Sequence, residues 1–318
     1  MTVRRRGLAE LGVAILGLAV LIALPFAWPS PAVIDFVIRL SAYALFATSL
    51  NLLVGYGGMV SFGHGMFFGF GAYCFGLLMQ RLTMPIPLAL LATLVCAAGV
   101  GAAVGALSVR LRAIYFAFVT LAMQMLLYSI IIAWVSLTGG DQGLRGGIPR
   151  PAFFGIDLTK QSQLYQASCV VLVVGLLLMR HILDAPFGYS LRMIRDNEAR
   201  AVFLGIRVYL AKLIAFTLAA VFAALGGVVM SLYVSGAYPE LAFWTTSGEG
   251  VFIIIMGGVD TFLGPALGAV LLLLLEDITT RVTEYKDLVL GVVILVFALG
   301  LRRGLLDFLQ ARLRAERA

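Results

Sequence analysis

Charged side chains are scarce in this sequence of 318 residues, where Asp, Glu, Lys and Arg together make up 12%. Soluble domains carry about 25% charged residues, so the composition excludes an ordinary soluble domain. Apolar residues make up 62% and recur in runs of roughly 20, the length of a helix that crosses a bilayer. The runs are continuous, whereas strands of a membrane barrel alternate apolar and polar residues. The sequence therefore predicts an all-α polytopic membrane protein, with a single domain over residues 1–318.

Residues suited to catalysis or metal binding are also few. The chain has two histidines, His64 and His181, and its three cysteines are isolated within apolar runs. No group has the spacing of metal ligands, so we expect no metal site, no catalytic residue and no enzyme activity. None of the three lysines lies in a P-loop, which needs Gly-x-x-x-x-Gly-Lys-[Ser/Thr]. We therefore expect this chain to bind no cofactor, and any ATP that drives it to be bound by another chain.

The apolar runs predict about eight to ten transmembrane helices. A less regular region at 245–275 precedes the last run, and ionisable residues within the runs are rare. Asp35 and Arg39 lie four residues apart on one predicted helix, so we expect them to pair with each other. The predicted spans are Leu11–Ala27, Val33–Val54, Ser61–Gln80, Ile86–Ser108, Ala113–Leu137, Leu164–Leu183, Tyr209–Val234 and Leu288–Leu301.

The basic residues behind the net charge of +7 lie mainly in short connectors and at the two ends. This distribution follows the positive-inside rule and does not indicate nucleic-acid binding. If the basic start is cytoplasmic, the turn at 110–112 and the connector at about 184–210 are also inside, and the loop at about 138–163 is outside. A cytoplasmic C-terminus then requires an even number of crossings. Region 245–275 is therefore predicted to be a hairpin or a re-entrant pair of half-helices, in a multi-pass membrane protein with both termini in the cytoplasm.

Two glycine-rich breaks interrupt the apolar runs, near residues 55–65 and within 245–275. Both contain Gly-Gly-x-x-[Ser/Thr]-Phe, at 57–62 and at 257–262. Paired interrupted segments in two halves of a chain are typical of a transport site made of broken helices. The alternative is coincidence among small residues that pack helices closely. The candidate pathway residues, each of which has local helix packing as its alternative role, are Gly57, Gly58, Ser61, His64, Glu249, Gly257, Gly258 and Thr261.

A charged stretch at 187–207 separates two long apolar runs. Ser190, Asp196 or Asn197 is suited to cap a short helix there, and Gly205 to end it. Asp196 and Arg200 have the spacing of a helical ion pair. Apolar side chains alternate with the charges, which favours a docking surface for a soluble partner over an ordinary cytoplasmic loop. The candidate contact residues are Arg192, Arg195, Asp196, Asn197, Glu198, Ala199 and Gly205.

Four segments together resemble a known family. They read Ser49-Leu-Asn-Leu-Leu-Val-Gly-Tyr-Gly-Gly-Met-Val-Ser-Phe-Gly-His-Gly65, Leu137-Thr-Gly-Gly-Asp-Gln-Gly-Leu144, Arg192-Met-Ile-Arg-Asp-Asn-Glu-Ala199 and, around the second break, Met256-Gly-Gly with Gly264-Pro-Ala-Leu-Gly-Ala269. The set resembles the inner-membrane permeases of branched-chain amino acid ABC importers, in the LivM-like branch. The likeness covers nearly the whole chain in order.

The resemblance implies a permease subunit that provides the translocation pathway. Its partners would be a homologous permease, two ATP-binding cassette ATPase subunits and a soluble substrate-binding protein, periplasmic or lipid-anchored, while the lipid bilayer surrounds it. The segment 198–205 is similar to the Glu-Ala-Ala…Gly coupling loop of such importers, but Arg200 replaces the second alanine and Gly205 lies one residue late. A urea or short-chain amide importer is the alternative within this class. An ATP-independent channel or facilitator is the alternative outside it.

Overall fold

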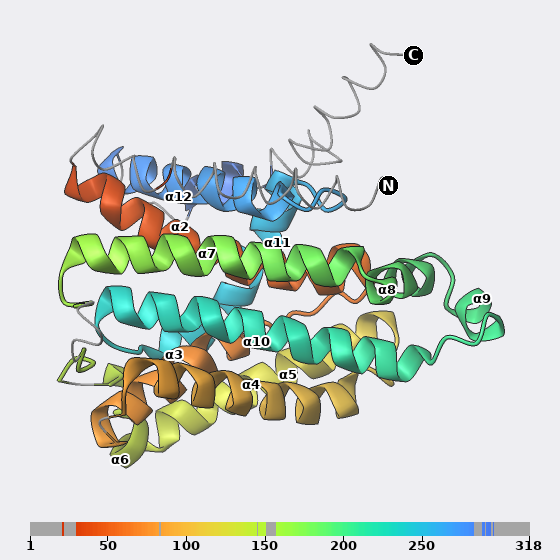
Figure 1. Cartoon of the computed structure of the whole chain (residues 1–318), viewed down its shortest axis with the longest axis horizontal. Helices are drawn as coiled ribbons and strands as arrows, with labels where there is room; N and C mark the ends of the chain where they lie inside the picture. Colours follow the sequence, from red (N-terminus) through yellow and green to blue (C-terminus); the bar gives the residue numbers. More distant parts are fainter. Residues whose placement is uncertain are drawn as a thin grey trace, which may run out of the picture.

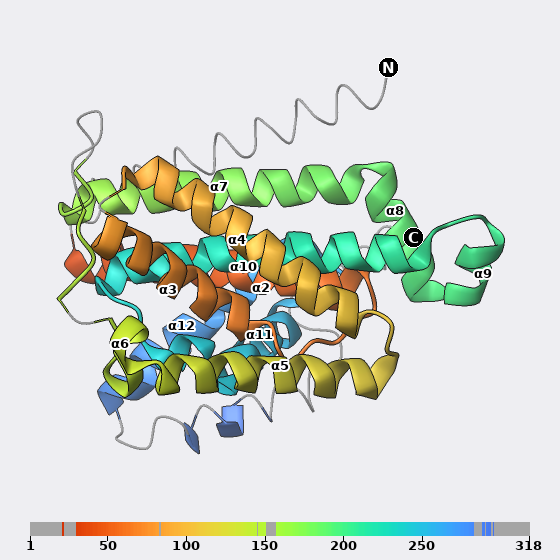
Figure 2. The same cartoon turned by 90° about the horizontal axis from the view of Figure 1, so that it is seen from below.

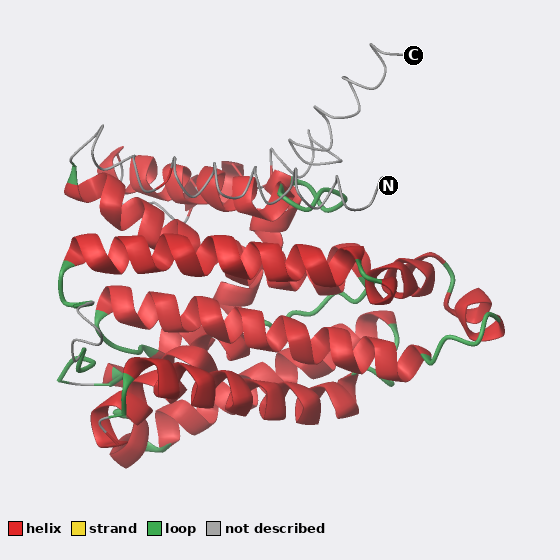
Figure 3. Cartoon of the chain, viewed as in Figure 1, coloured by secondary structure: helices red, strands yellow, loops and turns green. Residues whose placement is uncertain are grey.

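The computed structural model describes residues 21, 30–82, 84–144, 146–150, 157–282, 288–289, 291–293 and 295, and these form helices joined by loops, with no strand among them (Figure 3). The long helices lie side by side along one axis (Figure 1). Their order is α2 (Pro31–Asn51), continued by a wider helical turn at Leu52–Tyr56, then α3 (Gly65–Leu82), α4 (Ile86–Ser108), α5 (Ala113–Ala133), α6 (Val135–Thr138), α7 (Gln161–Asp184), α8 (Pro186–Asp196), α9 (Glu198–Phe203), α10 (Val208–Val234), α11 (Trp244–Gly257) and α12 (Gly264–Val282). Short 3₁₀ turns occupy Gly140–Gln142 and Pro239–Ala242.

Five helices in the described part are long and apolar enough to cross a membrane: Pro31–Tyr56, Ile86–Ser108, Ala113–Ala133, Gln161–Asp184 and Val208–Val234. Each coincides with a predicted span, and the chain is a multi-pass membrane protein. The helix predicted from Ser61 begins at Gly65 instead, because the four residues before it belong to the first glycine break. The spans predicted at 11–27 and 288–301 lie wholly or largely outside the described residues.

Helix α10 lies at the centre and packs against α2, α3 and α4. Small residues set how closely α10 approaches α3. A Cβ on Gly227 would lie 1.9 Å from the carbonyl oxygen of Phe68, and a Cβ on Gly71 would lie 2.2 Å from that of Ala224. Such backbone contact is the usual way in which membrane helices associate, since lipid supplies no hydrophobic force between them.

The two ends of the bundle differ in character (Figures 1 and 2). Helices α8 and α9 project at one end, and α6 with the 3₁₀ turn after it lies at the other. The turn between α4 and α5 lies at the α8–α9 end, where Arg112 approaches Glu198. Leu144 and Ile148 are bonded to the residues that follow α10: the Leu144 N–H donates to the Ala237 carbonyl at 2.9 Å, and the Ile148 N–H to the Ser235 carbonyl at 3.2 Å. The basic turn and the charged stretch therefore share one end, and the loop predicted to be outside lies at the other, as the count of crossings requires.

The region at 245–275 is not one straight helix. It consists of α11 and α12, separated at residues 258–263, as the even number of crossings predicted. Gly258 ends α11 at φ 121°, a conformation that favours glycine. With 14 residues, α11 is about 21 Å long, too short for a hydrocarbon core of about 30 Å. The two helices approach tightly, because a Cβ on Gly268 would lie 1.9 Å from the Ile253 carbonyl oxygen.

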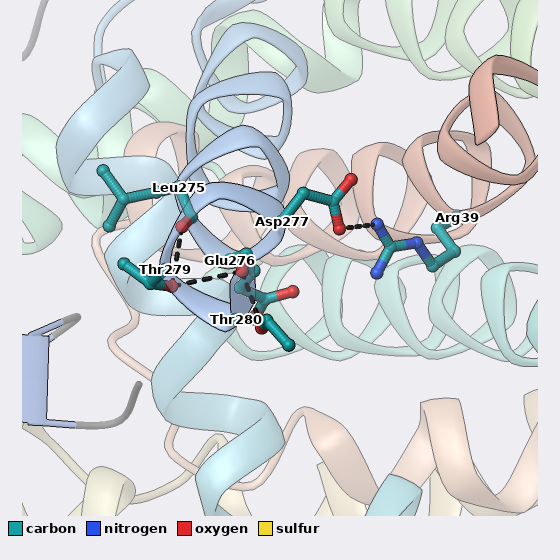
Figure 4. Close-up of polar contacts among 6 residues, drawn as sticks. All are labelled: Arg39, Leu275, Glu276, Asp277, Thr279 and Thr280. Atoms are coloured by element: carbon teal, nitrogen blue, oxygen red, sulfur yellow. Dashed lines mark hydrogen bonds and ion pairs between the residues drawn. The ribbon is translucent and has the colours of Figure 1, made fainter. Parts of the chain in front are cut away.

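The predicted pair of Asp35 with Arg39 is wrong. Arg39 donates instead to the carboxylate of Asp277 on α12 (Figure 4). Asp35 accepts a hydrogen bond from Gln161 Nε2 at 2.6 Å. Helix α2 packs against both α7 and α12, so each side chain reaches a partner on a different neighbouring helix. These contacts join segments more than 100 residues apart, which sequence spacing does not reveal.

Candidate functional site

Helices α8 and α9 form because the sequence marks their ends. Pro186 occupies the first turn of α8, where a missing N–H costs nothing. Asn197 has an extended backbone that separates α8 from α9, and it caps α9. Its side chain accepts a hydrogen bond from the Arg200 N–H at 2.9 Å. Gly205, at φ 81°, ends α9: its N–H donates to the Val202 carbonyl, and the Ile206 N–H to that of Ala201. The predicted cap and stop are confirmed.

Two arginines of α8 point back into the bundle. Arg192 lies over the rings of Tyr56 and Tyr189, with 5.1 and 5.4 Å to their centroids. Arg195 donates to the Gly55 carbonyl and, through Nη2, to Asp260 Oδ1 at 3.0 Å. Both side chains were predicted to face a partner protein. In the structure they hold α8 against the first break, and Arg195 also contacts the second, while the contact with a partner stays a prediction.

Glu198 of α9 likewise faces the bundle. Its Oε2 accepts from Lys212 Nζ at 2.9 Å, and its Oε1 lies 3.8 Å from Arg112. The Lys212 side chain is 90% buried, so this pair fixes α9 to the start of α10. No ion pair joins Asp196 to Arg200 in the described residues, because Asp196 ends α8 and the chain turns before Arg200. The predicted pair is therefore wrong.

The outward face of α9 is apolar at its tip. Phe203 is 91% exposed, and Val202 and Leu204 are more than half exposed. Ala199 and Arg200 are also exposed on this short helix. Among the exposed large apolar side chains in the described part of the chain, Phe203 is the most exposed, and it ends α9, which projects at one end of the bundle (Figure 1).

The two Gly-Gly breaks lie against each other. Asn51 Nδ2, one turn before the first break, donates to the carbonyl of Val259 in the second at 3.2 Å. A Cβ on Gly55 would lie 2.6 Å from that same oxygen. In each motif the second glycine has positive φ, 66° at Gly58 and 121° at Gly258. The sequence motif at 57–62 and 257–262 thus corresponds to two broken segments in contact.

The polar pathway candidates lie mostly inside the fold. Ser61 and His64 are fully buried, and His64 Nε2 lies 2.9 Å from Ser49 Oγ. Thr261 Oγ1 is buried without a hydrogen-bond partner. Glu249 is half-buried on α11, beside the hydroxyl of Tyr43. None of these four side chains lines the open cavity beside the charged helices, and their role in a pathway stays a prediction.

Sequence reasoning missed a buried polar chain beside the first break. Ser247 Oγ accepts from the Gly65 N–H and donates to Gln124 Oε1, each at 2.7 Å. Gln124 Nε2 then donates to the Phe243 carbonyl at 2.7 Å and to that of Ala242 at 3.1 Å. A glutamine in the middle of a predicted span was the available signal, because buried amides in lipid need partners.

An open cavity of about 530 Å³ lies between the first break and the charged helices. Its walls come from four segments: the first break, the α4–α5 turn, the α8–α9 junction and the start of α10. Gly57 and Gly58 are the pathway candidates that reach it, and Arg195, Asp196, Asn197 and Glu198 contribute its polar wall. No group of His, Cys, Asp or Glu suited to a metal ion occurs in the ranges that the structure describes.

A bundle of apolar helices with two broken segments in contact, and a charged helix pair at one end, is the architecture of a polytopic membrane protein. Residues 32–298 match the family described as branched-chain amino acid transport system / permease component, and the chain belongs to this family.

Relatives of both permease types of such a system are similar to the chain. It is 26% identical to the high-affinity branched-chain amino acid transport system permease protein LivM of Escherichia coli K12, over 94% of this chain and 76% of LivM. It is 26% identical to LivH of the same strain, over 84% of this chain and 91% of LivH. It is also 27% identical to the autoinducer 2 import system permease protein LsrC of Salmonella paratyphi B, over 66% of this chain and 61% of LsrC. No solved structure matches the chain significantly.

Proposed function

We propose that this chain is the transmembrane permease subunit of an ATP-driven importer of branched-chain amino acids. It pairs with a homologous permease and takes its energy from two ATPase subunits, while a soluble binding protein delivers the substrate. The similarity to LivM over nearly the whole chain supports the substrate class. Both termini and the α8–α9 end are cytoplasmic in this proposal, in agreement with the basic residues at that end.

The exposed tip of α9 carries the proposal of a partner ATPase. Phe203 is 91% exposed beyond the membrane helices and forms an apolar patch with Val202 and Leu204, and an exposed apolar patch marks an interaction site. It projects from a helix whose other contacts, through Glu198 and Lys212, are directed inward. Phe203 is therefore the proposed docking contact, while Glu198 holds α9 in place through Lys212.

The first break supports the proposal of a second permease and a pathway. Residues 59–63 are not helical and alternate in burial: Met59, Ser61 and Gly63 are buried, and Val60 and Phe62 are exposed. Irregular backbone at membrane depth is tolerated only beside protein or a water-filled cavity. The second permease and the pathway between the two chains therefore lie on the side of Val60 and Phe62. Ser61 and His64 shape the break from behind.

Purification tests the docking contact. Phe203→Ser should retain much less of the ATPase subunits than the intact chain, because losing a central aromatic contact costs about 2 kcal/mol or more, roughly 30-fold in affinity. Leu210→Ser is the matched control, since Leu210 is exposed at the same end but lies on α10. If no ATPase co-purifies with the intact chain, the importer is refuted. If Phe203→Ser retains the subunits as the intact chain does, the docking contact is wrong.

Uptake of labelled leucine, with urea as the competing candidate, tests the substrate. Import of leucine and not of urea by cells that carry this chain supports the proposal. Import of urea alone would support the urea or short-chain amide importer. Import of leucine without any ATPase subunit would support the ATP-independent channel or facilitator. The binding protein sets most of the selectivity, so the uptake assay includes it.

A further inference from the structure

One side chain of the charged helix pair contacts both glycine breaks. Arg195 donates to the carbonyl of Gly55 at the first break and to Asp260 at the second, with 3.0 Å between Nη2 and Oδ1. Its stem also covers Gly58, where a Cβ would lie 3.2 Å from Arg195 Cγ. Among the described residues of α8 and α9, no other side chain has a hydrogen bond or ion pair with each break.

The chemistry of arginine suits this position. The planar guanidinium presents several N–H donors in a fixed fork, so it reaches two acceptors at once. A lysine ammonium is a compact charge on a flexible stem and does not hold two acceptors in one plane. Because one acceptor is a backbone carbonyl, a displacement of Arg195 pulls on the chain of the first break directly.

Helix α8 is rigidly placed between the docking tip and the breaks. Leu191 and Ile194 are buried against the bundle, and Arg195 follows Ile194. Asn197 then joins α8 to α9. Only Asp196 and Asn197 separate Arg195 from α9, so a displacement of α9 would also displace Arg195.

We propose that Arg195 is a positioning residue that transmits movement of α8 and α9 to both glycine breaks together. This inference rests on the proposed function. The ion pair between Arg195 and Asp260 is partly exposed, because the Arg195 side chain is 38% exposed and that of Asp260 is 66% exposed. The pair therefore adds little to the stability of the fold. Arg195 instead connects helices α8 and α9 to both glycine breaks. Arg192, which stacks on Tyr56, holds only the first break.

The test compares Arg195→Lys and Asp260→Asn with Arg207→Lys in the complete complex, reconstituted in liposomes with its partner subunits. Arg207 is an exposed basic residue of the same end and serves as the matched control. The measured quantity is leucine imported per ATP hydrolysed. Loss of one contact of this partly exposed pair predicts a fall of up to roughly five-fold in this ratio for Arg195→Lys and Asp260→Asn, with the ATPase subunits still bound. Arg207→Lys should match the intact chain.

Amide hydrogen exchange on the same complexes supplies a second readout. Exchange at 55–60 and at 257–262 should rise together in Arg195→Lys and stay unchanged in Arg207→Lys. If the ATPase subunits bind normally and Arg195→Lys keeps the intact transport ratio, the inference alone is overturned. A rise in exchange at one break only overturns it as well. Failure of the intact chain to bind any ATPase overturns the proposed function, and the inference with it.

Discussion

Removing the charge of Glu198 should loosen α9 without removing the docking residue. Glu198 joins α9 to α10 through Lys212, with 2.9 Å between Oε2 and Nζ. The change Glu198→Gln keeps the size of the side chain but leaves Lys212 charged in a site that is 90% buried. Lys212→Met fills the same space with no charge. The double variant therefore removes both charges together.

The magnitude follows from how deeply the pair is buried. Fully exposed pairs contribute about 0–1 kcal/mol, and breaking a fully buried pair costs about 3–5 kcal/mol. The Glu198 side chain is 34% exposed and that of Lys212 is 10% exposed, so this pair lies between the two limits. We expect local opening of α9 to become easier by about 1–3 kcal/mol, which corresponds to a rise of roughly 5- to 150-fold in exchange rate.

Hydrogen exchange of the peptide that covers 198–205 measures this opening. Glu198→Gln should accelerate exchange there, and the double variant with Lys212→Met should recover most of the protection, because a neutral apolar side chain replaces the unpaired charge. Arg200→Gln is the control, since Arg200 is exposed on the same helix. Unchanged exchange in Glu198→Gln would refute the placement of this carboxylate. Faster exchange in the double variant than in either single variant would refute the pairing.

Two further predictions concern the packing of the bundle. Gly227→Val should prevent recovery of folded protein in detergent, because α3 and α10 are in backbone contact there, whereas Gly99→Val, with no atom near its Cβ, should purify normally. A normal yield of Gly227→Val would contradict the close crossing. Arg39→Met should lower the thermal stability of the purified chain and Arg39→Lys should lower it less, because only the lysine can still pair with Asp277. Equal loss in both variants would mean that the pair with Asp277 is not what stabilises this contact.

The sequence was sufficient for the fold class and for the positions of the five long apolar helices in the described part of the chain. Ile86–Ser108 was predicted to the residue, because its apolar run is bounded by Pro85 and by the basic turn at 110–112. The break at 258–263 also followed from sequence, since the count of basic connectors left no room for a single straight helix. The cap and the end of α9 were also predictable from sequence. Asn197 and Gly205 bond to backbone groups that lie within one turn of them along the chain.

The direction of side chains was not predictable. Arg195 and Glu198 were expected to contact a partner, and their contacts with Asp260 and Lys212 in the bundle were not foreseen, because Asp260 is distant in sequence and Lys212 lies on the next helix. Arg39 pairs across two helices for the same reason. The spacing of charges along one helix predicts only ion pairs within that helix. In a membrane protein the few charges pair wherever a neighbouring helix offers a partner, and that depends on packing.

Uptake by the reconstituted complex tests the central claim most directly. Liposomes that contain this chain, the homologous permease and the two ATPase subunits, with binding protein on the outer side, are loaded with ATP and given labelled leucine. We predict accumulation of leucine above the external concentration with ATP inside, and none with a non-hydrolysable analogue. Equal uptake with ATP and with the analogue, ending at the external concentration, would contradict an ATP-driven permease and indicate a facilitator.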